Sequence, residues 1–331
     1  MKMRQLALVL GALALGTIAC SSSSDPDRMT IAVIPKGTSH VFWQSVHAGA
    51  ARAAADLDVD IIWRGPLRED DRSAQISEVE GFVSRGVSGI VLAPLDDTAL
   101  VSPVADAVAR GIPVVVIDSG LRGEDFVSFV ATDNRQGGRI AGEGLRAMLP
   151  GGGKVVLLRY AEGSDSTTER EEGFLEAVRA ASEGFDVLSD NQYAGTDVES
   201  AYRRSETLLS RYKTPDGRLD VDGIFTPNES TTLAMLRVLQ DNGWAGQVRF
   251  IGFDASGTLV DGLEAGQIDG LVLQDPVRIG DLGVRTMVAH LRGEPVERRI
   301  DTGVRLVTRE GMDTPEARAL LHPPLDPGSR Q

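Results

Sequence analysis

Residues 89–118 read GIVLAPLDDTALVSPVADAVARGIPVVVID, and this stretch decides the class of the fold. Gly89–Ala93 and Pro113–Asp118 are short apolar runs rich in Val and Ile, which is typical of buried strands. Thr98–Arg110, between them, is expected to form an amphipathic helix. A strand, a helix and a strand in this order predict two parallel strands joined by a right-handed crossover.

The same unit repeats on both sides of this stretch. Before it, strands are expected at Met29–Pro35 and Val59–Trp63, and helices at Phe42–Asp56 and Arg72–Arg85. After Thr132-Asp133-Asn134 the pattern starts again, with helices and strands alternating at Asn134–Met148, Lys154–Tyr160, Thr167–Ala181, Asp186–Ser189, Val198–Arg211, Gly223–Thr226, Thr231–Asn242, Arg249–Phe253, Gly270–Gln274 and Val277–Arg292. The sequence therefore predicts an α/β fold with two doubly wound, Rossmann-like parallel-sheet lobes in series.

The first twenty residues are interpreted as a signal peptide. Lys2 and Arg4 form a short positive segment, and Leu6–Ala19 is an uncharged, mostly apolar run. That run is shorter than the ~20 residues that a membrane-spanning helix needs, but it suits the apolar region of a signal peptide. The chain is therefore expected to be exported to the periplasm or cell envelope.

The junction at Cys20 resembles a bacterial lipoprotein signal. Cys20 is the only cysteine, and residues 21–28 form a polar segment suited to a tether. The resemblance implies lipidation of Cys20 and a membrane anchor. Thr17 departs from the pattern, since Leu or Val is usual there, and the alternative is a plain signal peptide with an incidental cysteine. In either case the exported part has no disulfide.

Composition and net charge limit the classes of protein to which the chain can belong. A hydrophobic content of 42% suits a chain that builds cores, and 331 residues suit about two domains. The net charge of −14 argues against a nucleic-acid partner, because phosphate binding favours an excess of Lys and Arg.

Polar and aromatic side chains gather where the strands are expected to end. Ligands of doubly wound sheets bind outside the carboxyl ends of the strands. The planar polar candidates are Asp118, Arg170, Asn228, Asp254 and Gln274, and the aromatic ones are Phe42, Trp43 and Phe253. Carboxylates, amides and guanidinium groups bridge adjacent hydroxyls, and aromatic faces stack on the C–H face of a sugar ring. The set predicts a site for a small polyol or sugar.

These segments also carry a family resemblance. From about Met29 to about Val307 the chain resembles the type I periplasmic binding proteins of the ribose/galactose/xylose group. The matching segments are Phe42-Trp43, Ala93-Pro94-Leu95-Asp96, Asp118, Ala131-Thr132-Asp133-Asn134, Glu169–Phe174, Asn228-Glu229, Gly252-Phe253-Asp254 and Gln274. The resemblance implies the substrate-binding component of an ABC sugar importer, monomeric and without cofactor.

The resemblance assigns roles and boundaries. Phe42, Trp43 and Phe253 would stack on the sugar, while Asp118, Arg170, Asn228, Asp254 and Gln274 would bond its hydroxyls. The N-terminal lobe would comprise 29–132 and 275–302, the C-terminal lobe 133–274 and 303–313, with 314–331 as a tail that lies along the surface or frays. Three crossings near Thr132-Asp133, Gln274-Asp275 and Thr302-Gly303 would form the hinge.

Three positions depart from the ribose binders. His40 stands where they place an Asn, Ala93 where they place a second Asn, and Ser119 replaces an Arg. These departures predict a ligand other than ribose. One such ligand would be a polyol of a different shape that reaches toward His40 or Lys36.

The candidates also have ordinary structural interpretations. Phe42 and Trp43 would be core residues at the start of a helix. Asp118, Asn228 and Asp254 would cap turns or helices that follow strands.

The remaining polar residues allow the same alternative. Arg170 would be a solvated helix partner, Gln274 a hinge residue and His40 an exposed loop residue. The acidic pairs Asp96-Asp97 and Glu171-Glu172 adjoin helix starts, where acids complement the helix dipole. We expect no metal site and no acid–base catalysis from them.

Three other classes of protein are alternatives to a sugar importer's binding component. A repressor-type regulator needs a DNA-binding motif before the first strand, where residues 1–28 are too few. An enzyme on a doubly wound fold would need a nucleotide loop or a GxSxG elbow, and Lys36-Gly37-Thr38-Ser39 lacks the GxGxxG spacing. A binding protein that serves a chemoreceptor or sensor kinase remains an alternative to transport.

Overall fold

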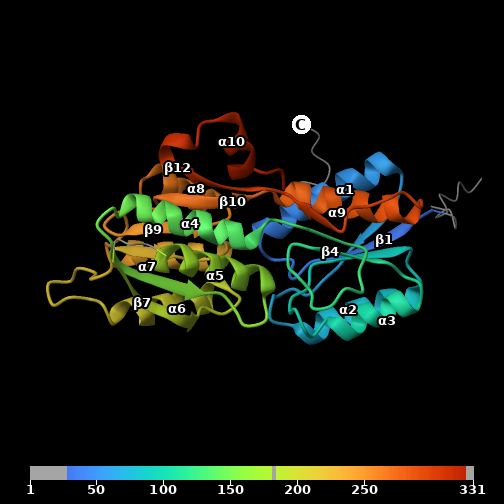
Figure 1. Ribbon diagram of the computed structural model, residues 1–331, viewed down its shortest axis with the longest axis horizontal. Coiled ribbons are helices and arrows are strands. Elements are labelled where there is room, and N and C mark those ends of the chain that lie inside the picture. The colour runs from blue at the N-terminus through green and yellow to red at the C-terminus, as the bar shows by residue number, and fades with distance from the viewer. Residues whose placement is uncertain (1–27, 181–183, 326–331) are drawn as a thin grey trace, which may run out of the picture.

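The computed structural model describes residues 28–180 and 184–325, which form two six-stranded sheets covered by helices. Figure 1 shows the two sheets with their helices as two lobes that lie side by side. The predicted α/β fold of two doubly wound lobes is confirmed.

The first sheet has the order β11-β5-β4-β3-β1-β2, and all its neighbouring strands are parallel. Its strands are β1 (Thr30–Ile34), β2 (Asp60–Trp63), β3 (Gly89–Leu92), β4 (Val114–Ile117), β5 (Ser128–Ala131) and β11 (Arg299–Asp301). Successive side chains of a strand point to opposite faces, so both faces of β1 must be covered. Ile31 and Val33 pack with the cluster that includes α1 (Val41–Leu57) and α9 (Pro276–Leu291), whereas Ala32 and Ile34 pack with the cluster of α2 and α3. The latter helices span Arg72–Arg85 and Val101–Ala109.

The second sheet has the order β12-β10-β9-β8-β6-β7, and only its edge strand β12 pairs antiparallel among the described strands. Its strands are β6 (Gly153–Arg159), β7 (Phe185–Tyr193), β8 (Gly223–Phe225), β9 (Arg249–Phe253), β10 (Gly270–Gln274) and β12 (Val304–Thr308). One face is covered by α4 (Asn134–Met148) and α5 (Asp165–Arg179). The other is covered by α6 (Val198–Ser210), α7 (Glu229–Asp241), α8 (Gly257–Glu264) and α10 (Pro315–Leu321), the last of which follows the 3₁₀ turn Arg309–Gly311.

The chain passes between the two sheets three times, and the three crossings are hydrogen-bonded to one another. They follow β5, β10 and β11. The Thr132 hydroxyl donates to Gln274 Oε1 at 3.0 Å and lies 3.3 Å from the Thr302 hydroxyl. All three side chains are buried, so the crossings share a small polar core.

Sequence reasoning missed five of the described helices and strands. They are β5, α8, β11, β12 and α10. The edge strands β11 and β12 leave much of their side chains exposed, so neither gives a clear hydrophobic pattern. The tail does not simply lie along the surface: it forms α10, whose Ala317 and Leu321 are buried against the core of the second lobe.

Some expectations fall on residues that the structure does not describe. The predicted signal peptide (1–20), Cys20 and nearly all of the tether lie outside the described residues. Within residues 28–180 and 184–325, no helix has the length and apolar character needed to span a bilayer.

Glycines bring the covering helices of each lobe into backbone contact. A Cβ on Gly280 of α9 would lie 1.9 Å from the Val46 carbonyl oxygen of α1, and one on Gly138 of α4 would lie 1.9 Å from the Arg170 carbonyl oxygen of α5. We therefore expect Gly280→Ala to lower the free energy of unfolding by about 1–3 kcal/mol, since the helices must separate. Urea denaturation followed by circular dichroism measures this change.

A matched control is available on α2. A Cβ on Gly81 would meet nothing within 4 Å. Gly81→Ala should therefore leave stability unchanged or raise it by about 0.5–1 kcal/mol, because alanine is the better helix former. Equal effects of the two substitutions would contradict the packing argument.

Candidate ligand-binding site

A cavity lies between the two lobes at the carboxyl ends of their strands. The space between its lining residues amounts to about 340 Å³, open solvent at its mouth included. Eight of the nine side chains predicted to bind a ligand line it: His40, Phe42, Trp43, Asp118, Arg170, Asn228, Asp254 and Gln274. Six further lining residues were not among the predicted set: Lys36, Glu69, Tyr160, Ser166, Thr167 and Glu229.

Two aspartates occupy equivalent places in the two lobes. Asp118 follows β4 and Asp254 follows β9, and both have left-handed backbones, with φ of 63° and 69°. Non-glycine residues rarely adopt this conformation, and such strain concentrates at functional sites. The kink turns each buried carboxylate toward the cavity at the end of its strand. Both therefore serve as candidate acceptors for ligand hydroxyls, beyond the turn-capping role that the sequence also allowed.

Arg170 is the central donor of the site. Its Nε donates to Asn134 Oδ1 at 2.8 Å and its Nη1 to the Pro227 carbonyl at 3.0 Å. The side chain is 2% exposed, and its Nη2 is buried with no hydrogen-bond partner within the described chain. A solvated helix partner would be exposed, so this interpretation of Arg170 is wrong. A buried donor without a partner costs about 1–3 kcal/mol, which a ligand oxygen can remove.

Phe253 has a different place from the predicted one. It is fully buried in the core between α4, α5 and the second sheet, and it is absent from the residues that line the cavity. The Arg170 guanidinium lies over its ring, 3.9 Å from the centroid. The prediction that Phe253 stacks on the ligand is therefore corrected: the ring supports Arg170 from behind, through a cation–π contact.

The aromatic pair at the start of α1 combines both interpretations offered by the sequence. The rings of Phe42 and Trp43 meet edge to face, with centroids 4.9 Å apart. Trp43 is 3% exposed, packs in the core of the first lobe and donates from Nε1 to Glu69 Oε1 at 2.7 Å. Phe42 is half-buried, and its backbone N–H donates to Glu229 Oε2 of the other lobe at 3.1 Å. Phe42 offers the more accessible ring for a sugar face.

His40 is not an exposed loop residue. Its Nδ1 lies 2.9 Å from Glu69 Oε1. Burial by itself would lower the pKa of His40, but the hydrogen bond and charge of Glu69, with Glu229 and Asp254 nearby, raise it to about 9. The imidazole is therefore positively charged at neutral pH.

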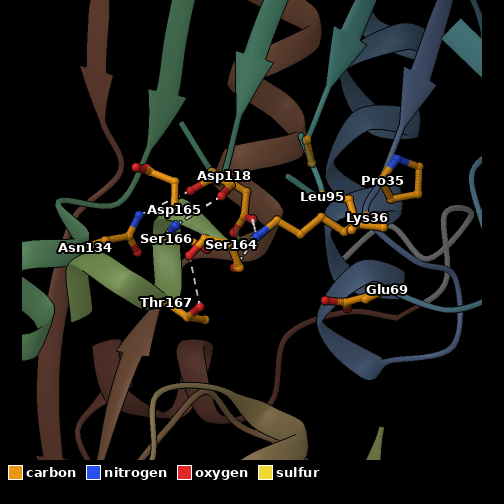
Figure 2. A network of polar contacts seen from close by, with 12 residues as sticks. Pro35, Lys36, Glu69, Leu95, Asp118, Asn134, Ser164, Asp165, Ser166 and Thr167 are labelled. Atoms are coloured by element: carbon orange, nitrogen blue, oxygen red, sulfur yellow. Dashed lines mark hydrogen bonds and ion pairs between the residues drawn. The ribbon is translucent and has the colours of Figure 1, made fainter. Parts of the chain in front are cut away.

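Lys36 is buried in the same cavity. Its amino group lies 3.3 Å from Asp118 Oδ2 and donates to Ser164 and Ser166 of the other lobe, at 3.2 and 2.9 Å. Figure 2 shows the side chain extending from the first lobe toward these three partners. The Ser166 N–H also donates to Ser119 Oγ at 3.0 Å. Ser119, where the ribose binders have an arginine, thus joins the two lobes.

Asn228 and Gln274 both line the cavity, and each also makes a structural hydrogen bond. Asn228 Oδ1 caps α7 by accepting from the Thr231 N–H, and its amide nitrogen has no hydrogen-bond partner among the described residues. Gln274 accepts from Thr132 at the hinge and donates from Nε2 to Asp254 Oδ1 at 2.7 Å. Burial raises the pKa of Asp254, against the opposing charge of Arg170.

The missed residues had weak signals in the sequence. Glu69 lies in the charged run Arg68–Arg72 after β2, where acidic side chains are normally solvated. Tyr160 directly follows β6, and its place after an apolar run made it look like one more strand residue. Their position at strand ends was the only available indication. The described residues contain no cluster of metal-ligating side chains.

Two α/β lobes that enclose a polar, aromatic-lined cavity at their strand ends, joined by three crossings, define a solute-binding protein that holds its ligand between lobes. Residues 31–295 match the model of the periplasmic binding protein domain. The chain belongs to this family of periplasmic binding proteins, which places it in the periplasm and among binding proteins of transport systems.

Known proteins are similar in sequence to this chain over nearly its whole length. The ribose import binding protein of Haemophilus influenzae is 29% identical over 306 residues, which cover 92% of this chain and all of the relative. A carbohydrate transporter solute-binding protein of Agrobacterium radiobacter, solved with D-arabinose, is 35% identical with a TM-score of 0.84, covering 90% of this chain and all of that one. An Agrobacterium vitis solute-binding protein with bound D-fucose is 34% identical with a TM-score of 0.83, covering 88% and 100%.

Proposed function

We propose that this protein captures a monosaccharide or a related polyol between its lobes and delivers it to an ABC-type sugar importer. The observation that carries the proposal is the buried Nη2 of Arg170, a charged donor without a partner in a cavity that also holds Asp118 and Asp254. A guanidinium beside carboxylates matches a ring of hydroxyls, which donate and accept at once. Relatives solved with D-arabinose and D-fucose support this ligand class.

The ligand is proposed to be a sugar or polyol other than ribose. Ala93 is fully buried and offers no side-chain hydrogen bond. The hydroxyl oxygen of Ser119 accepts a hydrogen bond from the backbone N–H of Ser166. Lys36 and His40 add positive charge near Asp118 and Glu69. The hydrogen-bond donors to the ligand would therefore belong to other residues than in a ribose-binding site.

Ligand binding would act by closing the lobes. Lobes made of 29–132 with 275–302 and of 133–274 with 303–313 fit the membership of the strands in the two sheets. Contacts such as Lys36 with Ser166 join these lobes, so a ligand that bridges them shifts the equilibrium toward the closed form. The closed form would dock on a membrane permease as a monomer, anchored through a lipid on Cys20, and would catalyse no reaction.

Isothermal titration calorimetry of the exported chain with D-arabinose, D-fucose, D-ribose, xylitol and myo-inositol tests the proposal. We expect heat of binding with at least one compound and weaker binding of D-ribose than of that compound. Absence of heat with every pentose, hexose, polyol and cyclitol tried would overturn it.

A further inference from the structure

Glu69 is a buried carboxylate inside the cavity whose oxygens are bonded to protein donors. It is 8% exposed, and it follows β2 in the first lobe. Its Oε1 accepts from Trp43 Nε1 at 2.7 Å and lies 2.9 Å from His40 Nδ1. Its Oε2 accepts from the Tyr160 hydroxyl of the second lobe at 2.7 Å. Figure 2 shows Glu69 and Lys36 entering the same space from the first lobe.

The site is built to hold this carboxylate. A Cβ on Gly37 would lie 2.8 Å from Glu69 Cγ, so a larger residue in the loop after β1 would displace the Glu69 side chain or the loop. With two donors on one oxygen and a third on the other, Glu69 has little capacity left for a ligand hydroxyl. Its contacts indicate that it acts through its neighbours.

Among the neighbours of Glu69, His40 is the residue whose hydrogen-bonding character depends on the carboxylate. An ionised carboxylate only accepts, so the hydrogen between the two groups is on His40 Nδ1. The other ring nitrogen, Nε2, has no hydrogen-bond partner within the described chain, and His40 lines the cavity. A neutral ring with its hydrogen on Nδ1 would present Nε2 as an acceptor, whereas a protonated ring presents an N–H donor.

We propose that Glu69 is a positioning residue which fixes His40 as a hydrogen-bond donor toward a ligand oxygen and joins it to Tyr160 when the lobes close. This inference rests on the proposed function, since it concerns the same cavity. Tyr160 lies in the second lobe and Glu69 in the first, so their hydrogen bond requires the closed arrangement.

The charges around His40 support the assignment. Acidic groups reach it from three elements: Glu69 after β2, Glu229 at the start of α7 and Asp254 after β9. The other charged or titratable groups of the cavity are Lys36, Asp118, Arg170 and Tyr160. The pKa of Glu69 is lowered to about 2 because its bonds and charge contacts with His40, aided by Lys36 and Trp43, outweigh the effect of burial. The same contacts therefore favour the protonated form of His40 and the ionised form of Glu69.

The first test needs no ligand. The exported chain carries ¹³C-labelled histidine, and the ring resonance of His40 is assigned by its loss in His40→Asn. We expect this resonance to titrate above pH 8 in the wild type and at least one pH unit lower in Glu69→Gln, which keeps the shape and loses the charge. Glu80→Gln, at an exposed position of α2, serves as the control and should titrate as the wild type does. Equal midpoints in wild type and Glu69→Gln would overturn the inference.

The second test uses calorimetry with the five compounds of the panel at pH 6, 7 and 8. For any compound that binds, the ratio of the affinity at pH 6 to that at pH 8 should be larger in Glu69→Gln than in the wild type, because only protonated His40 donates. The ratio should be about twofold larger if the pKa of His40 falls by one unit and about ninefold larger if it falls by two. Tyr160→Phe should weaken binding several-fold and keep the pH profile of the wild type. A pH profile unchanged by Glu69→Gln contradicts the role of His40 as a fixed donor.

The two proposals fail in different ways. If no compound binds the wild type, the proposed function fails, while the resonance of His40 still decides the role of Glu69. If compounds bind and the resonance of His40 does not move, the function stands and this inference falls.

Discussion

Replacing Arg170 by methionine is expected to weaken sugar binding by about 30- to 5,000-fold. Truncating one partner of a buried, charge-assisted hydrogen bond costs about 2–5 kcal/mol, which corresponds to this range of affinities. Arg170 places Nη2 in the cavity while Asn134 and Pro227 hold the rest of the guanidinium. Methionine retains an apolar side chain of similar reach over Phe253 and removes every donor. Calorimetry with the panel compound that binds the wild type most tightly measures the loss.

Two further variants separate the role of the guanidinium from other effects. Arg170→Lys keeps the charge without the planar fork, so we expect it to bind more weakly than the wild type and more tightly than Arg170→Met. Arg179→Met, at an exposed position on the same helix α5, should bind as the wild type does. Circular dichroism melts confirm that each variant is folded. Wild-type affinity in a folded Arg170→Met would remove Arg170 from the site.

Asp118→Asn is expected to lower the free energy of unfolding by about 3–5 kcal/mol, although it changes few atoms. Breaking a buried ion pair leaves the remaining charge uncompensated. Lys36 lies 3.3 Å from Asp118 Oδ2, and both side chains are 4% exposed. Asparagine tolerates the left-handed backbone at this position, where φ is 63°, so the substitution tests the charge and not the conformation.

The double variant Asp118→Asn/Lys36→Met provides the control. Removing both charges leaves no unpaired ion, so we expect it to recover most of the stability lost in Asp118→Asn. Urea denaturation of the wild type, both single variants and the double variant gives the coupling between the two groups. Additive losses would show that Lys36 and Asp118 do not form a stabilising pair.

Much of the fold could be predicted because local pattern and tertiary environment agree in this chain. The apolar runs of β1, β3 and β4 are buried on both faces, so their side chains must be apolar whatever the details of packing. The helices α2 and α4 begin and end at the predicted residues, since Asp71 and Asp133 cap them and Gly86 ends the first. Strands such as β11 and β12 escaped prediction because an edge position leaves their side chains half exposed.

The candidate site shows where sequence reasoning stops. The position of strand ends predicted that Asn228 and Asp254 would lie together, because the carboxyl ends of parallel strands share one edge of a sheet. Asp118 follows a strand of the other sheet, and it meets them because the two lobes face each other across the cavity. Sequence position could not decide whether the ring of Phe253 faces the ligand or packs behind Arg170, since a residue at the end of a strand can do either. The orientation of one ring depends on packing against α4 and α5, which no local pattern encodes.

The sequence by itself determined the α/β class, the repetition of the doubly wound unit and most of the side chains at the strand ends. Only the tertiary structure decided which charges pair. Lys36 pairs with Asp118, and Glu69 contacts His40 and Tyr160 of the other lobe, although the partners in each contact lie far apart in the chain. The physical reason is that burial and hydrogen bonding set the charge and the donor or acceptor character of a titratable group, and both depend on neighbours that only folding brings within about 3 Å.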